Sequence, residues 1–224
     1  MIGRGPSGPG PSGPGLTGGG LLVLVVAWLW PLPHLGLPPF TTHMTMHMAV
    51  VAVAAPLLAL GVAGTRADLV VRRPAWMAAI PASLVELMIV WVWHAPALHE
   101  LARDHLALKA LEQLSFLGAG VWLWLSALGG RPAQRRERAT AGVTALLLTA
   151  MHMTLLGALL VVAPRVLYPC VRLCGGVDAL TDQHIGGAIM LLVGGAAFAA
   201  GAALVATLKA GREQTLGARS DGSA

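Results

Sequence analysis

Histidine and methionine recur at helical spacing in the segment TTHMTMHM, residues 41–48. His43 and His47 are four residues apart, so on an α-helix they lie on one face, with Met44 and Met48 on the adjacent face. Imidazole and thioether groups together favour Cu(I) over zinc, whereas methionine alone is more often a gap-filling residue of a helical bundle. We expect these four side chains to bind a metal ion, and copper before others.

Three further histidines fall where they could complete this site. His152 stands between two methionines in the run MHM, His94 closes the segment WVWH, and His184 opens the last apolar stretch. Burying an imidazole in lipid without a partner is costly, so the number of such residues favours a shared ligand. We expect His94, His152 and His184 to join His43 and His47 at the metal.

Acidic residues accompany the histidines. A carboxylate can orient a ligating imidazole through a hydrogen bond, and we assign this role to Glu112 and Asp182. The alternative for Glu112 is an interfacial ion pair with Lys109, three residues before it. Glu86 falls near the centre of an apolar stretch, where an acid is either functional or protonated and hydrogen-bonded across the bundle. These two alternatives for Glu86 remain open.

Two cysteines, Cys170 and Cys174, occur in one short polar segment. They are too few for a disulfide scaffold or a four-cysteine zinc site. In an oxidising compartment a disulfide is the first expectation, and a reversible dithiol that takes copper is the second.

The elements that must position these residues are membrane helices. The chain of 224 residues is 56% hydrophobic and only 11% charged, which is not the composition of a soluble domain. Its basic residues lie between apolar runs and form no basic face with aromatics, so we exclude nucleic acid as a partner. Each apolar stretch is about the 20 residues that cross a bilayer, and the expected fold is an all-α integral membrane bundle of about six helices. The stretches are 16–37, 41–63, 75–97, 107–129, 140–163 and 184–208.

Domain boundaries follow from this division. Residues 1–15 are rich in Gly, Pro and Ser, a composition typical of a disordered tail. Residues 16–208 form the six-helix membrane domain, and residues 209–224 form a C-terminal tail on the cytoplasmic side.

Orientation follows from the lysines and arginines, which are concentrated in cytoplasmic loops of membrane proteins. One side of the predicted topology receives eleven of them and the other side four, namely Arg103, Lys109, Arg165 and Arg172. Both termini are therefore predicted to be cytoplasmic. All eight histidines then lie in the outer half or near the middle of the bundle.

Four segments in this order resemble the CtaG-type cytochrome c oxidase assembly proteins of bacterial inner membranes. They are HMTMHM, WVWHAPALHE, LEQLSFLGAGVWLW and the pair LYPC and LTDQHIGGAIM, and they cover about residues 40 to 200. The resemblance implies a multi-pass protein of the inner (plasma) membrane that is needed to mature haem–copper oxidases of the respiratory chain. It implies copper handling on the outer side, and partners that include the lipid bilayer, the oxidase subunits and a periplasmic copper donor.

Carried over by position, the family's histidines fall on His43, His47 and His94, its acidic residue on Glu112, and its aspartate–glutamine pair on Asp182 and Gln183. Two positions depart from the pattern. Gln113 stands where histidine is expected, and His99 stands where tyrosine is expected. His184 and the two cysteines have no counterpart in the pattern, so the exact ligand set is open.

Three functions account for these residues. The first is a non-enzymatic assembly factor, a metallochaperone that binds Cu(I) and passes it to an oxidase subunit by ligand exchange. The second is a membrane b-type cytochrome, with haem held between His47 and His152. The third is an integral-membrane zinc hydrolase, with three histidines and an aspartate such as Asp182 around an activated water.

Overall fold

The computed structural model describes residues 13–30, 32–169 and 176–221, and within these ranges every regular element is a helix. The elements are α1 (Gly13–Trp28), η1 (Leu32–His34), α2 (Pro39–Met48), η2 (Ala49–Ala54), α3 (Ala55–Val62), α4 (Leu69–Arg72), α5 (Ala79–Trp93), α6 (Pro96–Asp104), α7 (Leu106–Leu128), α8 (Pro132–Val162), α9 (Ala179–Ile189), η3 (Met190–Gly194) and α10 (Gly195–Asp221).

Four helices in the described ranges are long and apolar enough to cross a membrane: Pro39–Val62, Leu106–Leu128, Pro132–Val162 and Ala179–Gly211. The first joins α2 and α3 through the π-helical turn η2, and the last joins α9 and α10 through the π-helical turn η3. Helices α5 and α6 make a fifth candidate span, bent by 75° at a short break. The described part of the chain is thus all-helical and has the helices of a membrane protein.

Helix α1 is apolar but has only 16 residues, so the predicted count of six spans depends on it and stays a prediction. Two boundaries differ from the expected domains. Helix α1 begins at Gly13, within the predicted tail 1–15, and α10 continues to Asp221, through most of the predicted tail 209–224. Residues 1–12 lie outside the described part of the chain.

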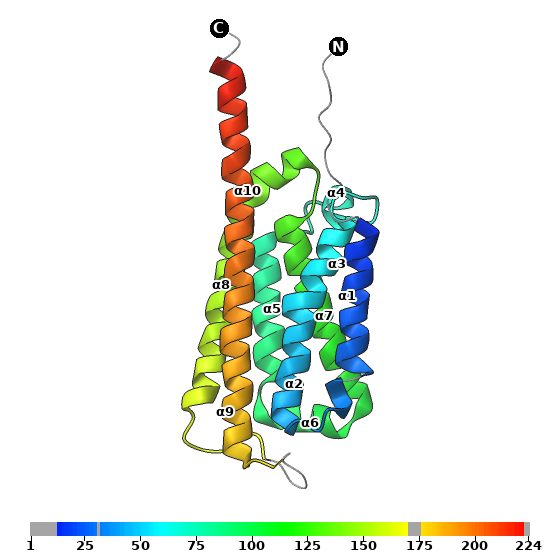
Figure 1. Cartoon of the computed structure of the whole chain (residues 1–224), viewed down its shortest axis with the longest axis vertical. Helices are drawn as coiled ribbons and strands as arrows, with labels where there is room; N and C mark the ends of the chain where they lie inside the picture. Colours follow the sequence, from blue (N-terminus) through cyan, green and yellow to red (C-terminus); the bar gives the residue numbers. More distant parts are fainter. Residues whose placement is uncertain (1–12, 31, 170–175, 222–224) are drawn as a thin grey trace.

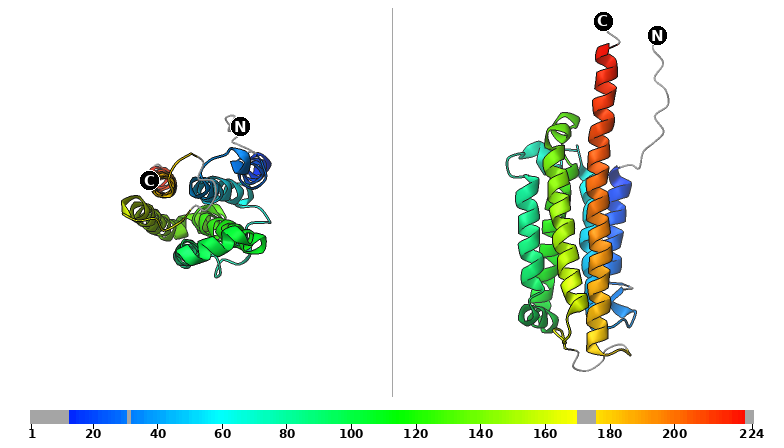
Figure 2. Two further views of the ribbon diagram at one scale, coloured as in Figure 1. Left: turned by 90° about the horizontal axis from the view of Figure 1, so that it is seen from below. Right: turned by 90° about the vertical axis from the view of Figure 1, so that its left-hand side faces the viewer.

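The long helices lie side by side, and α7 is central because it packs against α3, α5 and α8 (Figures 1 and 2). Helix α6 closes one end of the bundle, which we call the α6 end. The start of α1, the short helix α4, the start of α8 and the end of α10 gather at the opposite end, the α4 end (Figure 1). The first and last described residues therefore leave the bundle on the same side.

Glycines allow the close crossing of α8 with the last helix. A Cβ atom on Gly157 of α8 would lie 2.6 Å from the backbone nitrogen of Leu191, and one on Gly187 would lie 2.8 Å from Cβ of Leu160. Contacts this short leave no space for a side chain, so the two backbones pack directly. This crossing holds α9 and η3 against α8, the helix that carries His152.

A buried aspartate joins two turns at the α4 end. The carboxylate of Asp68 accepts hydrogen bonds from the backbone N–H groups of Gly64, Val70 and Gly130, at 2.6 to 2.8 Å. Gly64 and Gly130 have φ values of 79° and 92°, in the region that favours glycine. Asp68 thereby connects the turn after α3 to the turn between α7 and α8.

Candidate metal centre

Four imidazole rings meet at the α6 end of the bundle. His43 and His47 project from α2, His94 is the residue that ends α5, and His99 lies on α6. The ring centroid of His43 is 5.7 Å from that of His94 and 4.5 Å from that of His99, and His47 is 5.4 Å from His94. We call these four residues the histidine cluster.

The local structure explains how three elements converge. A spacing of four residues places His43 and His47 on one face of α2, as predicted. The break between α5 and α6 turns the chain by 75°, so His94 before it and His99 after it both reach the rings on α2. Phe116 of α7 packs beneath, with its ring 4.1 Å from that of His47.

Many ring nitrogens of the histidine cluster are buried without a hydrogen-bond partner among the described residues. They are Nε2 of His43, both nitrogens of His47, Nε2 of His94 and Nδ1 of His99. Leaving one buried polar atom unpaired costs about 1 to 3 kcal/mol. Several such atoms on rings that lie side by side favour a site built for a ligand, and a metal ion is a ligand that imidazole nitrogens readily share.

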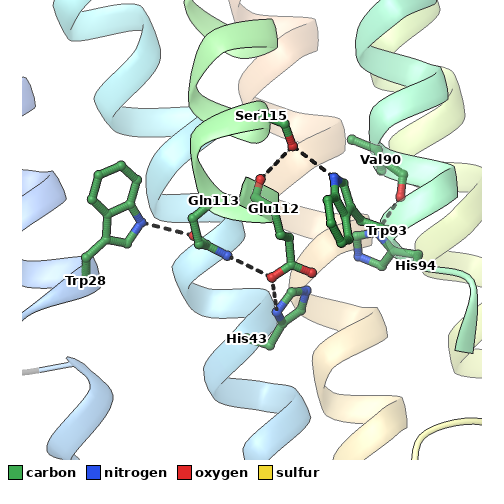
Figure 3. A network of polar contacts seen from close by, with 8 residues as sticks. All are labelled: Trp28, His43, Val90, Trp93, His94, Glu112, Gln113 and Ser115. Atoms are coloured by element: carbon green, nitrogen blue, oxygen red, sulfur yellow. Dashed lines mark hydrogen bonds and ion pairs between the residues drawn. The ribbon is translucent and has the colours of Figure 1, made fainter. Parts of the chain in front are cut away.

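A hydrogen bond beside the cluster sets the direction in which the imidazole of His94 presents its lone pair (Figure 3). Nδ1 of His94 lies 2.7 Å from the carbonyl oxygen of Val90, so this nitrogen carries the proton and Nε2 keeps its lone pair. An imidazole fixed in this way, as that of His94 is, is typical of metal ligands. Nδ1 of His43 lies 3.7 Å from Oε2 of Glu112, an ion-pair contact that is longer than a hydrogen bond.

The carboxylate of Glu112 is itself oriented by a chain of hydrogen bonds from α1 (Figure 3). The indole N–H of Trp28 donates to Oε1 of Gln113 at 3.0 Å, and the amide of Gln113 donates to Oε2 of Glu112 at 3.3 Å. The other oxygen, Oε1 of Glu112, is buried without a partner among the described residues. One ligand atom each of His43, His99 and Glu112 lies within 4.8 Å of the other two, so these three side chains could hold a metal ion together.

A groove connects this centre to the outside at the α6 end. It has a volume of about 270 Å³, and His43, His99 and Glu112 lie in its wall together with Met46. Arg103 and Lys109 also line it, opposite in charge to the two acids of its wall, Glu112 and Asp182. The groove allows an ion or a segment of a partner to reach His43 and His99, whereas His47 and His94 are buried behind them.

Tyr168 and Phe40 form an aromatic wall of the groove. Their rings stack at 4.2 Å, and the Tyr168 ring contacts that of His99 edge to face at 4.9 Å. Burial raises the pKa of Tyr168 above its usual range, so the hydroxyl stays protonated and donates to the carbonyl oxygen of His94 at 2.6 Å. This bond fixes the backbone at the break between α5 and α6.

The pair Asp182–Gln183 positions backbone segments. The Asp182 carboxylate accepts from the backbone N–H groups of Phe40 and Thr41 at 2.9 and 2.7 Å and from the Thr41 hydroxyl at 2.7 Å, so it caps the start of α2. Gln183 accepts from the N–H of Leu167 at 2.7 Å and holds the segment after α8. Asp182 thus acts on the helix that carries His43 rather than on an imidazole.

The predicted methionines lie away from the groove. Met44 packs against Gly186 and Met48 against Gly194, so both contact the last helix. Met46, which was not predicted as a ligand, lines the groove beside His43. A thioether side chain therefore lines the groove, on a different residue from those expected.

Two predicted histidines have other partners. Nε2 of His152 lies 2.8 Å from Oε2 of Glu86, and this pair is buried between α8 and α5. Nε2 of His184 lies 3.1 Å from the carbonyl oxygen of Ala163. Glu86 thus has a close buried partner, and both alternatives for its role stay open. Cys170 and Cys174 lie outside the described residues.

His99 is the member of the cluster that was missing from the predicted ligand set. It was noticed in the sequence as a departure from the family pattern, at a position where tyrosine is expected. A histidine that replaces another residue in a motif of suspected ligands is a signal that could have identified it. The bend that brings His99 to His43 could not be anticipated from helical spacing alone.

These features define an all-helical membrane protein with a histidine-rich, carboxylate-containing centre at one end. Its chain belongs to the cytochrome c oxidase caa3 assembly factor family, whose model matches residues 17–209. The resemblance seen in the four sequence segments is thereby confirmed. A search of curated proteins and a search of solved structures each found no match.

Proposed function

We propose that this protein supports the assembly of a haem–copper oxidase by binding copper at the histidine cluster and handing it to an oxidase subunit. The observation that carries the proposal is the set of buried, unpartnered nitrogens on His43, His47, His94 and His99. Membership of an oxidase assembly family supplies the process, and copper is the cargo of that process suited to imidazole ligands.

The donor set suits a transferable ion. Imidazoles and a nearby thioether, Met46, are neutral ligands, and neutral soft ligands favour Cu(I). Glu112 adds a carboxylate that can compensate the charge of the ion. A site that opens through a groove allows ligands of a partner to replace these side chains one at a time.

Sidedness completes the proposal. We infer six spans, formed by the four long helices, the bent pair α5–α6 and α1, with both termini in the cytoplasm of a bacterial cell. Helix α1 is about 24 Å long at roughly 1.5 Å per residue. Residues at its ends that lie in the membrane interface bring this length closer to the thickness of the hydrocarbon core, about 30 Å. The α6 end, with the histidine cluster, then faces the periplasm, where a soluble copper donor could reach the groove.

A zinc hydrolase is the second candidate because two histidines and a carboxylate, His43, His99 and Glu112, are the donor types of several catalytic zinc sites. A b-type cytochrome is disfavoured. Haem was expected between His47 and His152, but Nε2 of His152 lies 2.8 Å from a carboxylate oxygen of Glu86, and the ring of His47 lies 5.4 Å from that of His94.

The test is metal analysis of the protein purified in detergent under anaerobic, reducing conditions. We compare wild type, the variant His43→Ala/His94→Ala and the control His105→Ala, whose imidazole is exposed at the same end. We expect about one copper per chain in wild type and control, and a loss of at least tenfold in affinity in the double variant.

The same variants are then expressed in cells that lack the wild-type protein, and the copper content of the oxidase is measured. We expect oxidase copper to fall with the double variant alone. Zinc in place of copper would support the hydrolase. Iron together with a haem absorption spectrum would support the cytochrome. Absence of any metal from wild type would exclude direct ligation and leave a scaffold for the oxidase subunit.

A further inference from the structure

A second groove lies at the α4 end, on the opposite side of the bundle from the histidine cluster. It forms where α10 runs past the first turns of α8 (Figure 1), and its enclosed volume is about 70 Å³. Three cations line it: Arg135 and Arg136 on α8 and Lys209 on α10. Its remaining walls are apolar and include Leu60, Leu204 and Leu208.

The charge of this groove is of one sign. No acidic residue is among the side chains that line it. Glu137, the acid next to Arg136, lines a different groove of α8 together with Arg138 and residues before α5. Three cations therefore face one small space without a carboxylate in its wall, which favours an anionic occupant.

Two of the cations are held in place by bonds that leave donors free. Nζ of Lys209 donates to the hydroxyl of Thr140 at 3.0 Å, and Nε of Arg135 donates to the carbonyl oxygen of Gly130 at 2.7 Å. An ammonium group has three donors and a guanidinium group has five, so each side chain keeps donors for an anion.

The apolar walls continue outside the groove. Leu204 and Leu208 are 45% and 48% exposed, and they follow one another at i, i+4 along α10 toward the middle of the membrane-spanning segment. An anion bound at the cations would therefore have an apolar strip beside it. This combination of a charged head site and an apolar track is the chemistry of a phospholipid.

We propose that this groove binds an anionic phospholipid, with the phosphate at Arg135, Arg136 and Lys209 and an acyl chain along Leu204 and Leu208. The enclosed volume accommodates a phosphate group and not a whole lipid, so the chains lie along the surface of α10. Basic pockets between helices at the cytoplasmic surface are known to hold such headgroups. The site is independent of the proposed copper centre.

The experiment uses the full chain in detergent, mixed with phosphatidylglycerol or with phosphatidylcholine of the same acyl chains, and retained lipid is counted by native mass spectrometry. We compare wild type, Arg136→Gln/Lys209→Gln and the control Arg72→Gln/Arg73→Gln, which removes two exposed cations from the same end outside the groove. Each cation near an anionic headgroup contributes about fivefold in affinity, so the groove variant, which lacks two, should lose about 25-fold and the control little.

Retention of phosphatidylglycerol over phosphatidylcholine by wild type and control, and its loss in the groove variant, would support the site. Equal retention of both lipids, or an unchanged groove variant, would overturn it. Full displacement of the lipid by millimolar inorganic phosphate would also overturn it, because the groove would then be a phosphate site. Circular dichroism of each variant establishes that the helices are intact before lipid is counted.

Discussion

At the residue scale, His94 illustrates how one hydrogen bond prepares a ligand. Its Nδ1 is taken by the carbonyl oxygen of Val90, which leaves Nε2 to face the cluster. Gln113 and His99 are the two departures from the family pattern, and both now have a place. His99 adds an imidazole to the cluster, and Gln113 connects Trp28 to Glu112.

Gln113→Leu should weaken copper binding without abolishing it. The change removes the amide that donates to Glu112 and breaks the link to Trp28, while every imidazole stays in place. Loss of a residue that orients a ligand typically lowers metal affinity 10- to 100-fold. Competition with a chromophoric Cu(I) chelator measures the change, and His105→Ala is the control. An unchanged affinity would show that Glu112 needs no orientation.

The pair Glu86–His152 should be a structural element of the core. Replacing one partner, as in Glu86→Leu or His152→Leu, leaves a buried polar group unpaired and should cost about 3 to 5 kcal/mol. The double variant Glu86→Leu/His152→Leu should recover most of that loss. A double-mutant cycle of unfolding in denaturing detergent measures the coupling. Additive losses of stability would contradict a stabilising pair. Loss of copper from the double variant would instead indicate a functional role.

At the element scale, the site depends on the break between α5 and α6 and on the cap that Asp182 provides at the start of α2. The bend of 75° between α5 and α6 places His94 and His99 on either side of one centre. The π-helical turns η2 and η3 lie in the two spans that begin with α2 and α9, the helices joined by Asp182. A π-helical turn changes the direction in which the residues after it project from the helix, and such turns are frequent near functional sites.

Asp182→Ala should destabilise the protein and disturb the start of α2. The buried carboxylate accepts hydrogen bonds from Phe40 and Thr41, and their loss should cost about 3 kcal/mol in the free energy of unfolding. Asp178→Ala is the matched control, because Asp178 also caps a helix but is exposed. Unfolding followed by circular dichroism should show the larger loss for Asp182. Equal losses would mean that the contact with α2 contributes nothing beyond a surface cap.

At the scale of the whole molecule, the two ends of the bundle have different chemistry. The α6 end holds the histidine cluster and its groove, and the α4 end holds the arginine-rich turns and the start of α8. Because positive charge is concentrated on the cytoplasmic side of membrane proteins, this polarity predicts the orientation.

Cysteine labelling tests that orientation. In a background without native cysteines, His105→Cys at the α6 end should react with an impermeant maleimide in intact spheroplasts. Ala67→Cys, at the α4 end, should react only after the membrane is opened. Both residues are exposed in the structure, so accessibility does not separate them. The opposite pattern would place the histidine cluster in the cytoplasm and exclude a periplasmic donor.

The sequence alone was sufficient for what depends on local periodicity. Apolar stretches of membrane length predicted the helices, and a spacing of four residues placed His43 and His47 on one face, because both depend on the geometry of a single helix. The four ordered segments also identified the family.

The tertiary structure decided which neighbour each helix face meets. It turned Met46 rather than Met44 and Met48 toward the groove, paired His152 with Glu86, and brought His99 to His43. None of these results follows from residue spacing. Spacing gives only the direction of a side chain relative to its own helix axis, whereas the bends and the packing of helices depend on contacts between residues that are distant in sequence. The centre therefore exists only once α2, α5, α6 and α7 are packed together.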